Sequence, residues 1–245
     1  MHLKFVQGLI YSLIAFSGLL SPVSAQETDE NDMFSYVADP KSQKIQLYWK
    51  DDRGEIIRTI QNLKSYVESK GETLIFGMNG GMYQGDYSAV GLLIIDKVTF
   101  HPINISSGGG NFYLKPNGVF YITTDNHPFI CKTEDFKDNG KIKYATQSGP
   151  MLLIEGAIHP AFNMNSTNCN IRNGVGILPS GKILFAMSKT PVTFYQFARF
   201  FNNQGCKNAL FLDGVVSEMY LPEMNLLHGI GNFGVLIGVT KKNER

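Results

Sequence analysis

The sequence predicts an α+β fold, a single domain built on a mainly antiparallel, mixed sheet with hairpins and a few packed helices. Three observations support this fold class. Many short apolar runs are typical of strands, two segments have the pattern of a β-hairpin, and only two segments carry apolar residues at helical spacing. We expect this domain to span residues 34–245.

The N-terminal half is expected to hold three short strands and a helix. The strands are apolar runs at residues 34–38, 45–49 and 90–95. The helix covers residues 57–70, because its apolar residues recur every three or four positions. Gly71 follows it and can adopt the left-handed conformation that ends many helices.

Two segments that echo each other predict β-hairpins. FYLKPNGVFYI, at residues 112–122, and VGILPSGKILFAM, at residues 175–187, both place Pro-polar-Gly between apolar runs. Proline sets the first turn residue and glycine relieves the last one. The second segment also approaches a phosphate-binding loop, but Ile183 stands where that loop needs Ser or Thr, so we reject a nucleotide site.

The C-terminal part is expected to hold the second helix and two closing strands. Residues 193–203 carry an aromatic stripe at helical spacing, and Gly205 follows them. Such a stripe predicts a face buried in the core. The closing strands are the runs at 210–212 and 233–239.

A secretory signal peptide is predicted at residues 1–25. Lys4 precedes an apolar run that ends at Leu20, and small residues then lead to a cleavage site after Ala25. The run is short for a membrane helix, so no stable span is expected after cleavage. Residues 26–33 are mostly polar and acidic, and we expect a disordered lead-in there. The pattern predicts an exported protein, periplasmic or extracellular.

Charge and cysteine content narrow the function classes. One of the 22 Lys and Arg residues lies in the signal, so 21 remain against 21 Asp and Glu residues. This balance argues against nucleic acid or an anionic membrane as a partner. Cys131, Cys169 and Cys206 permit one disulfide after export, and the three pairings stay open, as does the oligomeric state.

Four polar stretches that contain glycine could carry chemistry. They are NGGMY at 79–83, QSGPML at 147–152, RNGVG at 172–176 and FLDGVVSEMY at 211–220. Each alone could be a turn. Together they offer an amide, a hydroxyl, a guanidinium and a carboxylate beside glycines, where the backbone can approach a ligand closely. This inventory suits the binding of a sugar and a phosphate.

In this order, FGMNGGMY, ATQSGPMLLIEGAIHPAF, IRNGVGI and NALFLDGVVSEMY resemble the motifs of the phosphodiester glycosidase family. GGGNFYLKPNGVFYI looks like a compact bacterial subgroup of that family. The resemblance extends from about Leu74 to Val239. It implies hydrolysis of the bond between a sugar's anomeric carbon and a phosphodiester oxygen, which releases a sugar and a phosphomonoester. The family's last motif often reads LDGGGS, whereas Val215 and Val216 stand here and narrow the space above the backbone.

Carboxylates are the candidates for catalysis, because glycosyl cleavage develops positive charge on the sugar ring. Asp213 is our first choice as nucleophile, general base or electrostatic partner, and Glu218 is the second. Asp86 and Glu155 are further options. Asp213 could instead cap Gly214 in a turn at the end of a strand. Retention or inversion stays open, since it depends on the separation of the two carboxylates in space.

The remaining candidates would bind the phosphate or the sugar. The planar fork of Arg172 matches phosphate oxygens, and the N–H groups around Gly80 and Gly81 could form an anion-binding nest. Asn79 is expected to orient the ligand, because an amide does not titrate, and Ser148 to donate a hydrogen bond. The whole predicted binding set is Asn79, Gly80, Gly81, Ser148, Gly149, Arg172, Gly214 and Ser217.

Two other functions and a metal stay open. The two valines of the last motif also suit a noncatalytic glycan- or phosphate-binding protein that kept the fold. A secreted esterase could use Ser148, although the sequence around it is not the G-x-S-x-G of a hydrolase elbow. Asp213, Asp86 and Asn79 offer the oxygen ligands that Mg²⁺ or Ca²⁺ prefer.

Overall fold

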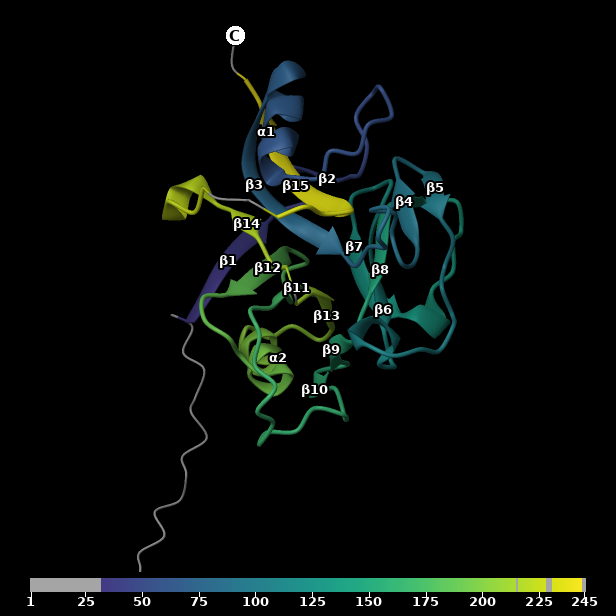
Figure 1. Cartoon of the computed structure of the whole chain (residues 1–245), viewed down its shortest axis with the longest axis vertical. Helices are drawn as coiled ribbons and strands as arrows, with labels where there is room; N and C mark the ends of the chain where they lie inside the picture. Colours follow the sequence, from purple (N-terminus) through teal and green to yellow (C-terminus); the bar gives the residue numbers. More distant parts are fainter. Residues whose placement is uncertain (1–31, 215, 228–230, 244–245) are drawn as a thin grey trace, which may run out of the picture.

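The computed structural model describes residues 32–214, 216–227 and 231–243, so the predicted signal peptide lies outside the described residues. The described chain forms three antiparallel sheets and two α-helices, which confirms the predicted α+β class (Figure 1). Neither of these helices is long and apolar enough to cross a bilayer.

The largest sheet has six strands in the order β1-β12-β11-β13-β9-β10. Their bounds are β1 Met33–Ala38, β9 Met151–Ile154, β10 Ala157–Ile158, β11 Asn173–Ile177, β12 Ile183–Ser188 and β13 Ala209–Asp213. Strands β11 and β12 are the second predicted hairpin, which is confirmed. Its turn closes through Leu178 N and Lys182 O at 2.9 Å, with Gly181 in the left-handed region at φ 78°.

The second sheet has four strands in the order β14-β3-β15-β2. Their bounds are β2 Lys44–Tyr48, β3 Glu72–Gly81, β14 Met219–Tyr220 and β15 Val235–Lys242. Helix α1 (Ile60–Ser69) packs on β3 and β15. It begins later than predicted, because Thr59 caps it by accepting from Asn62 N at 3.0 Å, and Ile57 is held extended by Trp49 O at 2.9 Å.

The third sheet has five strands in the order β5-β4-β8-β6-β7. Their bounds are β4 Leu93–Ile95, β5 Val98–His101, β6 Gly118–Thr123, β7 Pro128–Lys132 and β8 Ile142–Ser148. The first predicted hairpin is wrong, because Asn111–Tyr113 form a 3₁₀ turn and β6 pairs with β7 and β8 instead. Phe112 is buried there, and Asn117 Nδ2 donates to Phe112 O at 2.9 Å, which folds this segment into a loop.

Three aromatic rings connect the three sheets in the main core. Phe185 of β12 stacks on Phe76 of β3, with 5.0 Å between ring centroids, and meets Phe120 of β6 edge-on at 6.2 Å. All three are buried in one apolar cluster. Close packing at this junction therefore fixes how the sheets lie against one another.

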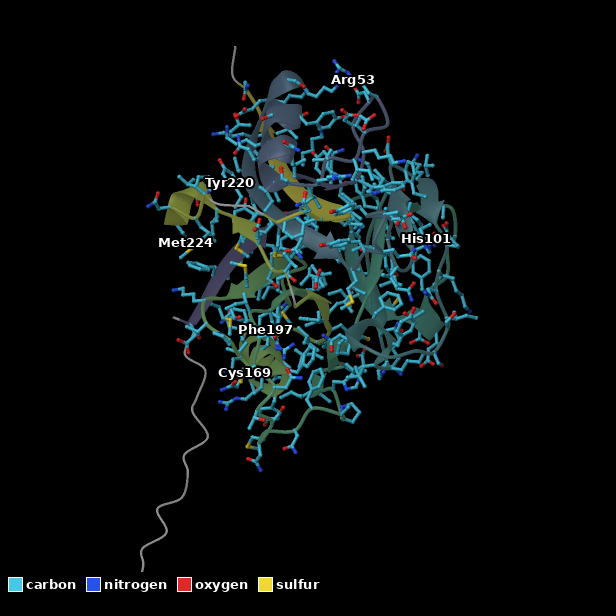
Figure 2. The ribbon with its side chains drawn as sticks, in the orientation of Figure 1. Arg53, His101, Cys169, Phe197, Tyr220 and Met224 are labelled. Carbon is cyan, nitrogen blue, oxygen red and sulfur yellow. The ribbon has the colours of Figure 1, made fainter. Side chains whose placement is uncertain are left out.

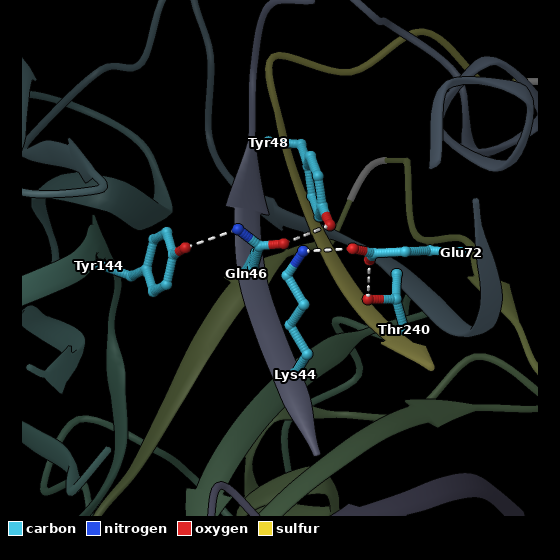
Figure 3. Close-up of polar contacts among 6 residues, drawn as sticks. All are labelled: Lys44, Gln46, Tyr48, Glu72, Tyr144 and Thr240. Carbon is cyan, nitrogen blue, oxygen red and sulfur yellow. Dashed lines mark hydrogen bonds and ion pairs between the residues drawn. The ribbon is translucent and has the colours of Figure 1, made fainter. Parts of the chain in front are cut away.

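A polar network also joins the second and third sheets (Figure 3). Gln46 of β2 donates to the hydroxyl of Tyr144 on β8 at 2.6 Å and accepts from Tyr48 Oη at 3.0 Å. Within the second sheet, Lys44 of β2 and Glu72 of β3 form an ion pair at 2.6 Å across the intervening strand β15.

Helix α2 (Phe194–Asn203) covers one face of the six-stranded sheet (Figure 1). Thr193 and Gln196 form a capping box at its start, through hydrogen bonds of 3.1 and 2.9 Å. Phe197 and Phe201 are fully buried, so the aromatic stripe is core as predicted.

Candidate active site

Asn173, the first residue of β11, belongs to the third of the four predicted stretches and connects it to the first and the fourth. Its side-chain nitrogen donates to Asn79 O at 2.9 Å and to Asn79 Oδ1 at 2.8 Å. Its side-chain oxygen accepts from Asp213 N at 2.8 Å. Both asparagines are fully buried, so these hydrogen bonds are shielded from water. Asn173 is absent from the residues predicted above; its one sequence signal is an amide beside Arg172, ahead of an apolar run.

Asp213 ends β13 beside a β-bulge. Asn173 pairs with Asp213 while Gly174 pairs with Phe211, so Leu212 is the extra residue. A bulge of this kind changes the direction in which a side chain points. Asp213 Oδ1 accepts from Gly214 N at 2.6 Å, so the capping contact foreseen for this pair exists within the candidate site.

Glu218, the second predicted carboxylate, also contacts Asn79. Glu218 N donates to Asn79 Oδ1 at 2.9 Å, and the next two residues pair with β3 as strand β14. Its carboxylate accepts from Gly231 N at 2.6 Å. The paired amides of Asn79 and Asn173 therefore hold the backbones of Asp213, at the end of β13 in the six-stranded sheet, and Glu218, just before β14 in the four-stranded sheet.

Tyr83 lies close to this network. Burial and the charge of Asp213 raise the pKa of the Tyr83 phenol. Its hydroxyl donates to Asn232 O at 2.5 Å, and its ring stacks on Tyr87 with 5.5 Å between centroids. Tyr83, the last residue of NGGMY, therefore places a protonated phenol near Asp213.

The second stretch meets the fourth through Ser148. Ser148 Oγ donates to Leu212 O at 2.7 Å, directly before Asp213, and is fully buried. Its hydrogen is thus used on a main-chain carbonyl, and no histidine among the described residues bonds to it, so the esterase alternative gains no support. Ser217 Oγ approaches Asp213 O at 3.0 Å and Ile171 O at 3.3 Å, which folds the loop after β13 back toward the third stretch.

The glycines of these stretches are explained by packing. Gly80 and Gly81 lie inside β3 without a left-handed φ, so they do not form the nest predicted for them. A Cβ at Gly81 would lie 2.7 Å from Thr146 Oγ1, and one at Gly80 would lie 2.7 Å from a side-chain carbon of Ile237. Both glycines therefore allow β3 to approach its neighbours closely.

The same reason applies to the other two glycines of the predicted binding set. A Cβ at Gly149 would lie 2.5 Å from Asn117 Cβ. A Cβ at Gly214 would collide with the ring of Phe211.

Arg172 is buried on the α2 side of the six-stranded sheet. Its Nε donates to Val192 O at 2.8 Å, its Nη2 donates to Asn168 O at 2.9 Å, and its Cζ lies 3.7 Å from the ring centroid of Phe194. Burial lowers the pKa of Arg172 to about 10, which leaves it charged at neutral pH. Part of the fork predicted for phosphate is thus occupied, whereas Nη1 forms no hydrogen bond with any described residue. Arg172 Cζ also lies 5.6 Å from the ring centroid of Phe211, a residue of β13 two positions before Asp213, and the Phe194 and Phe211 rings meet edge-on at 4.8 Å.

The other ionisable candidates lie apart from the network. Asp86 and Glu155 are exposed, and Asp86 Oδ1 accepts from Ser88 N at 3.0 Å within a turn. His159, which follows the second stretch, is buried and stacks on Phe162 at 4.8 Å. No group of three His, Cys, Asp or Glu side chains in the described part of the chain is arranged to hold a metal. The three cysteines, all within that part, are free thiols.

Taken together, the fold and site define a β-rich domain whose remote strands bring amides and carboxylates to one buried point. Residues 72–234 match the family model of the phosphodiester glycosidases (NAGPA), and the chain belongs to that family. The predicted family is therefore confirmed.

Several known proteins are similar to this chain. The uncharacterized protein YigE of Escherichia coli K12 is 36% identical over 188 residues, which cover 76% of this chain and 73% of YigE. The zebrafish N-acetylglucosamine-1-phosphodiester α-N-acetylglucosaminidase catalytic domain, auto-inhibited by its pro-peptide, has a TM-score of 0.51 and 15% identity over 87% of this chain and 89% of its own. The "Putative exported protein" of Burkholderia pseudomallei K96243 has a TM-score of 0.52 and 10% identity over 84% and 73% of the two chains. At such low identity the two structures share the fold alone with this protein.

Proposed function

We propose that this protein is an exported hydrolase that cleaves the glycosyl bond of a sugar-1-phosphodiester and releases a free sugar and a phosphomonoester. The observation that carries the proposal is the Asn79–Asn173–Asp213 chain of hydrogen bonds, which gathers the family's motifs at one point. A glycan or a smaller sugar-1-phosphodiester would be the substrate. The predicted signal peptide supports export, as does the name of the similar Burkholderia protein.

The carboxylates would act on the sugar side of the bond. As the bond breaks, positive charge develops on the sugar ring, and Asp213 would stabilise it or attack the anomeric carbon. Glu218 would be the second carboxylate, since its backbone N–H donates to Asn79, the hydrogen-bond partner of the asparagine that holds Asp213 N. The Gly214 N–H that donates to Asp213 Oδ1 fixes the orientation of this carboxylate, which suits either role.

The phosphate side of the bond needs charge stabilisation more than a proton. A phosphate ester leaves readily because its conjugate acid is strong, so a general acid is less necessary than for an alcohol. Arg172 would supply the positive charge through Nη1, the nitrogen without a hydrogen bond to the described residues. Its contacts with Val192, Asn168 and Phe194 would hold the guanidinium in one orientation before the substrate arrives.

Turnover by the purified mature chain tests the proposal. The chain is assayed on UDP-GlcNAc and on nitrophenyl sugar-phosphodiesters, and Asp213→Asn is compared with Ser217→Ala. We expect Asp213→Asn to lower kcat by about 100-fold or more, in the range typical of lost acid–base groups. Its amide oxygen can still accept from Gly214 N, so the melting temperature should change little. Ser217→Ala should retain turnover.

Two outcomes would contradict the proposal. Full turnover by Asp213→Asn would exclude the proposed role of this carboxylate. Binding of sugar phosphates without turnover on a broad panel would favour a noncatalytic glycan- or phosphate-binding protein.

A further inference from the structure

A groove of about 400 Å³ lies beside Met82, the residue that follows Asn79-Gly80-Gly81. Residues 109–113 form one wall, and the segment after β3 forms another. His101, at the end of β5, also lines it and appears at the outer side of the five-stranded sheet (Figure 2). Val90, Asn104, Asn111, Phe112 and Tyr113 also line the groove.

Contacts of the second stretch connect this groove to the candidate active site. A Cβ at Gly149 would lie 3.0 Å from the carbonyl oxygen of Phe112, a groove residue. The preceding residue, Ser148, donates to Leu212 O, next to Asp213. Thus Ser148 and Gly149, at the end of β8, lie between the groove and the strand end that carries the proposed catalytic carboxylate.

Gln147 of the same stretch also supports the groove. Its Oε1 accepts from Asn104 N at 2.8 Å, and its Nε2 donates to Asn104 O at 2.7 Å. Asn104 Nδ2 in turn donates to Val90 O at 3.0 Å, while Val90 N donates to Met82 O at 3.1 Å. Met82, Val90 and Asn104 line the groove, so part of its lining is held by hydrogen bonds before any ligand binds.

None of the residues that line the groove is Asp, Glu, Lys or Arg. The side chains of Asn111 and Tyr113 form no hydrogen bonds with other described residues. The Tyr113 ring meets Phe112 edge-on, with 5.0 Å between centroids. The groove therefore combines an amide, a phenol and an aromatic surface, all available to a ligand.

We propose that this groove binds an uncharged sugar ring of the substrate, with the Asn111 amide and the Tyr113 hydroxyl on the sugar hydroxyls and the aromatic surface against the ring. The inference rests on the proposed function, and it assigns the place where the sugar of that substrate binds. Amides and phenols both donate to and accept from hydroxyl groups, and aromatic rings cover apolar C–H surface. A phosphate, by contrast, would find no fixed positive charge among these residues, whereas Arg172 offers one elsewhere.

Direct binding tests the proposal without requiring turnover. The mature chain is titrated with uncharged methyl glycosides of several hexoses and N-acetylhexosamines, and separately with inorganic phosphate, using ligand-observed NMR or calorimetry. Wild type should bind at least one methyl glycoside. Asn111→Ala and Tyr113→Phe should each weaken that binding by about 3- to 10-fold, the usual effect of one neutral hydrogen bond. Phosphate binding should not change.

Three further variants separate groove binding from loss of fold. Gly109→Phe should block the groove, because Gly109 lines it and the new ring would occupy part of its volume. The fold should tolerate this change, because a Cβ at Gly109 would meet nothing within 4 Å and the φ of Gly109 lies outside the left-handed region. The matched controls are Asn203→Ala and Tyr195→Phe on α2, which remove the same groups away from the groove. Both controls should leave glycoside binding unchanged.

The outcomes distinguish this inference from the proposed function. Wild type that binds no methyl glycoside, or groove variants that weaken phosphate binding instead, would overturn the sugar assignment. If Asn111→Ala, Tyr113→Phe and Gly109→Phe all hydrolyse the substrate with an unchanged KM, the sugar assignment is overturned while the proposed function stands. Glycoside binding lost in these variants, with no hydrolysis of any phosphodiester by wild type, would support the groove and contradict the proposed function.

Discussion

One side-chain nitrogen of Asn173 donates to both the main-chain and the side-chain oxygen of Asn79, at 2.9 and 2.8 Å. The two residues are 94 positions apart in the sequence. Because Asn173 also accepts from Asp213 N, a single amide positions β3 against the end of β13. The geometry of the candidate site therefore depends on a residue that need not touch the substrate.

Replacing Asn173 with alanine should destabilise the protein and abolish activity. The change leaves Asp213 N buried without its side-chain acceptor, which costs about 1–3 kcal/mol, and also removes the two hydrogen bonds to Asn79, whose Oδ1 still accepts from Glu218 N. Urea unfolding measures the loss. The exposed Asn203→Ala should shift stability by no more than about 0.5 kcal/mol. Equal stability of Asn173→Ala and wild type would show that the network carries little energy.

Gly81→Ala should destabilise the fold through Thr146. The added methyl group would lie 2.7 Å from Thr146 Oγ1, and such overpacking costs about 1–3 kcal/mol. In a Thr146→Ala background the cost should fall by roughly 1 kcal/mol, because the colliding atom is gone. A double-mutant cycle from urea unfolding measures this coupling. Additive effects would indicate that Gly81 serves something other than this contact, such as approach to a ligand.

Arg172→Lys should weaken phosphodiester binding, although lysine keeps the positive charge. Lysine cannot reproduce the Nε bond to Val192 or the planar contact with Phe194, so the charge loses its fixed position. We expect KM for a sugar-phosphodiester to rise by about 10-fold or more, with a stability loss of about 1–3 kcal/mol. Steady-state kinetics at a temperature well below the melting transition separates the two effects. An unchanged KM would remove Arg172 from the phosphate site.

Stability should fall below about pH 6.5 because of His159. Burial lowers the pKa of this imidazole, although the nearby Lys115 carbonyl opposes the shift. The unfolded state then binds the proton more readily, so the contribution is complete above the unfolded pKa of about 6.5 and decreases as pH falls through the folded pKa. His159→Gln should therefore flatten the dependence of melting temperature on pH between about 5 and 7. Parallel curves for the two proteins would contradict this assignment.

Local pattern predicts the elements of this protein well where each is stabilised by its own neighbours. The spacing of apolar residues locates α2 and its buried stripe, and Pro-Ser-Gly at 179–181 locates the turn between β11 and β12. The same signal fails at Pro116, because Phe112 is buried and Asn117 bonds to its carbonyl instead of closing a hairpin turn. A turn motif states what the backbone tolerates, and the packing around it decides whether a hairpin forms.

The candidate site is only partly readable from the sequence. Asp213, Glu218 and Asn79 are recognisable by residue type and motif, and the structure brings their backbones together. The two glycines after Asn79 suggest a ligand contact, yet each has a packing neighbour that excludes a Cβ. Asn173 lies in the quoted stretch RNGVG, but its role cannot be read there, since an amide at the start of a strand has many ordinary roles.

The sequence by itself determined the α+β class, most of the strands, the two helices and the four stretches that mark the family. These properties depend on the periodicity of neighbouring residues and on local motifs. Only the tertiary structure decided that Asn173 joins Asn79 to Asp213, that Arg172 is stacked on Phe194, and that β3 passes close to Thr146. These contacts arise because aromatic packing sets the three sheets against one another, and no local rule encodes a hydrogen bond across 94 residues.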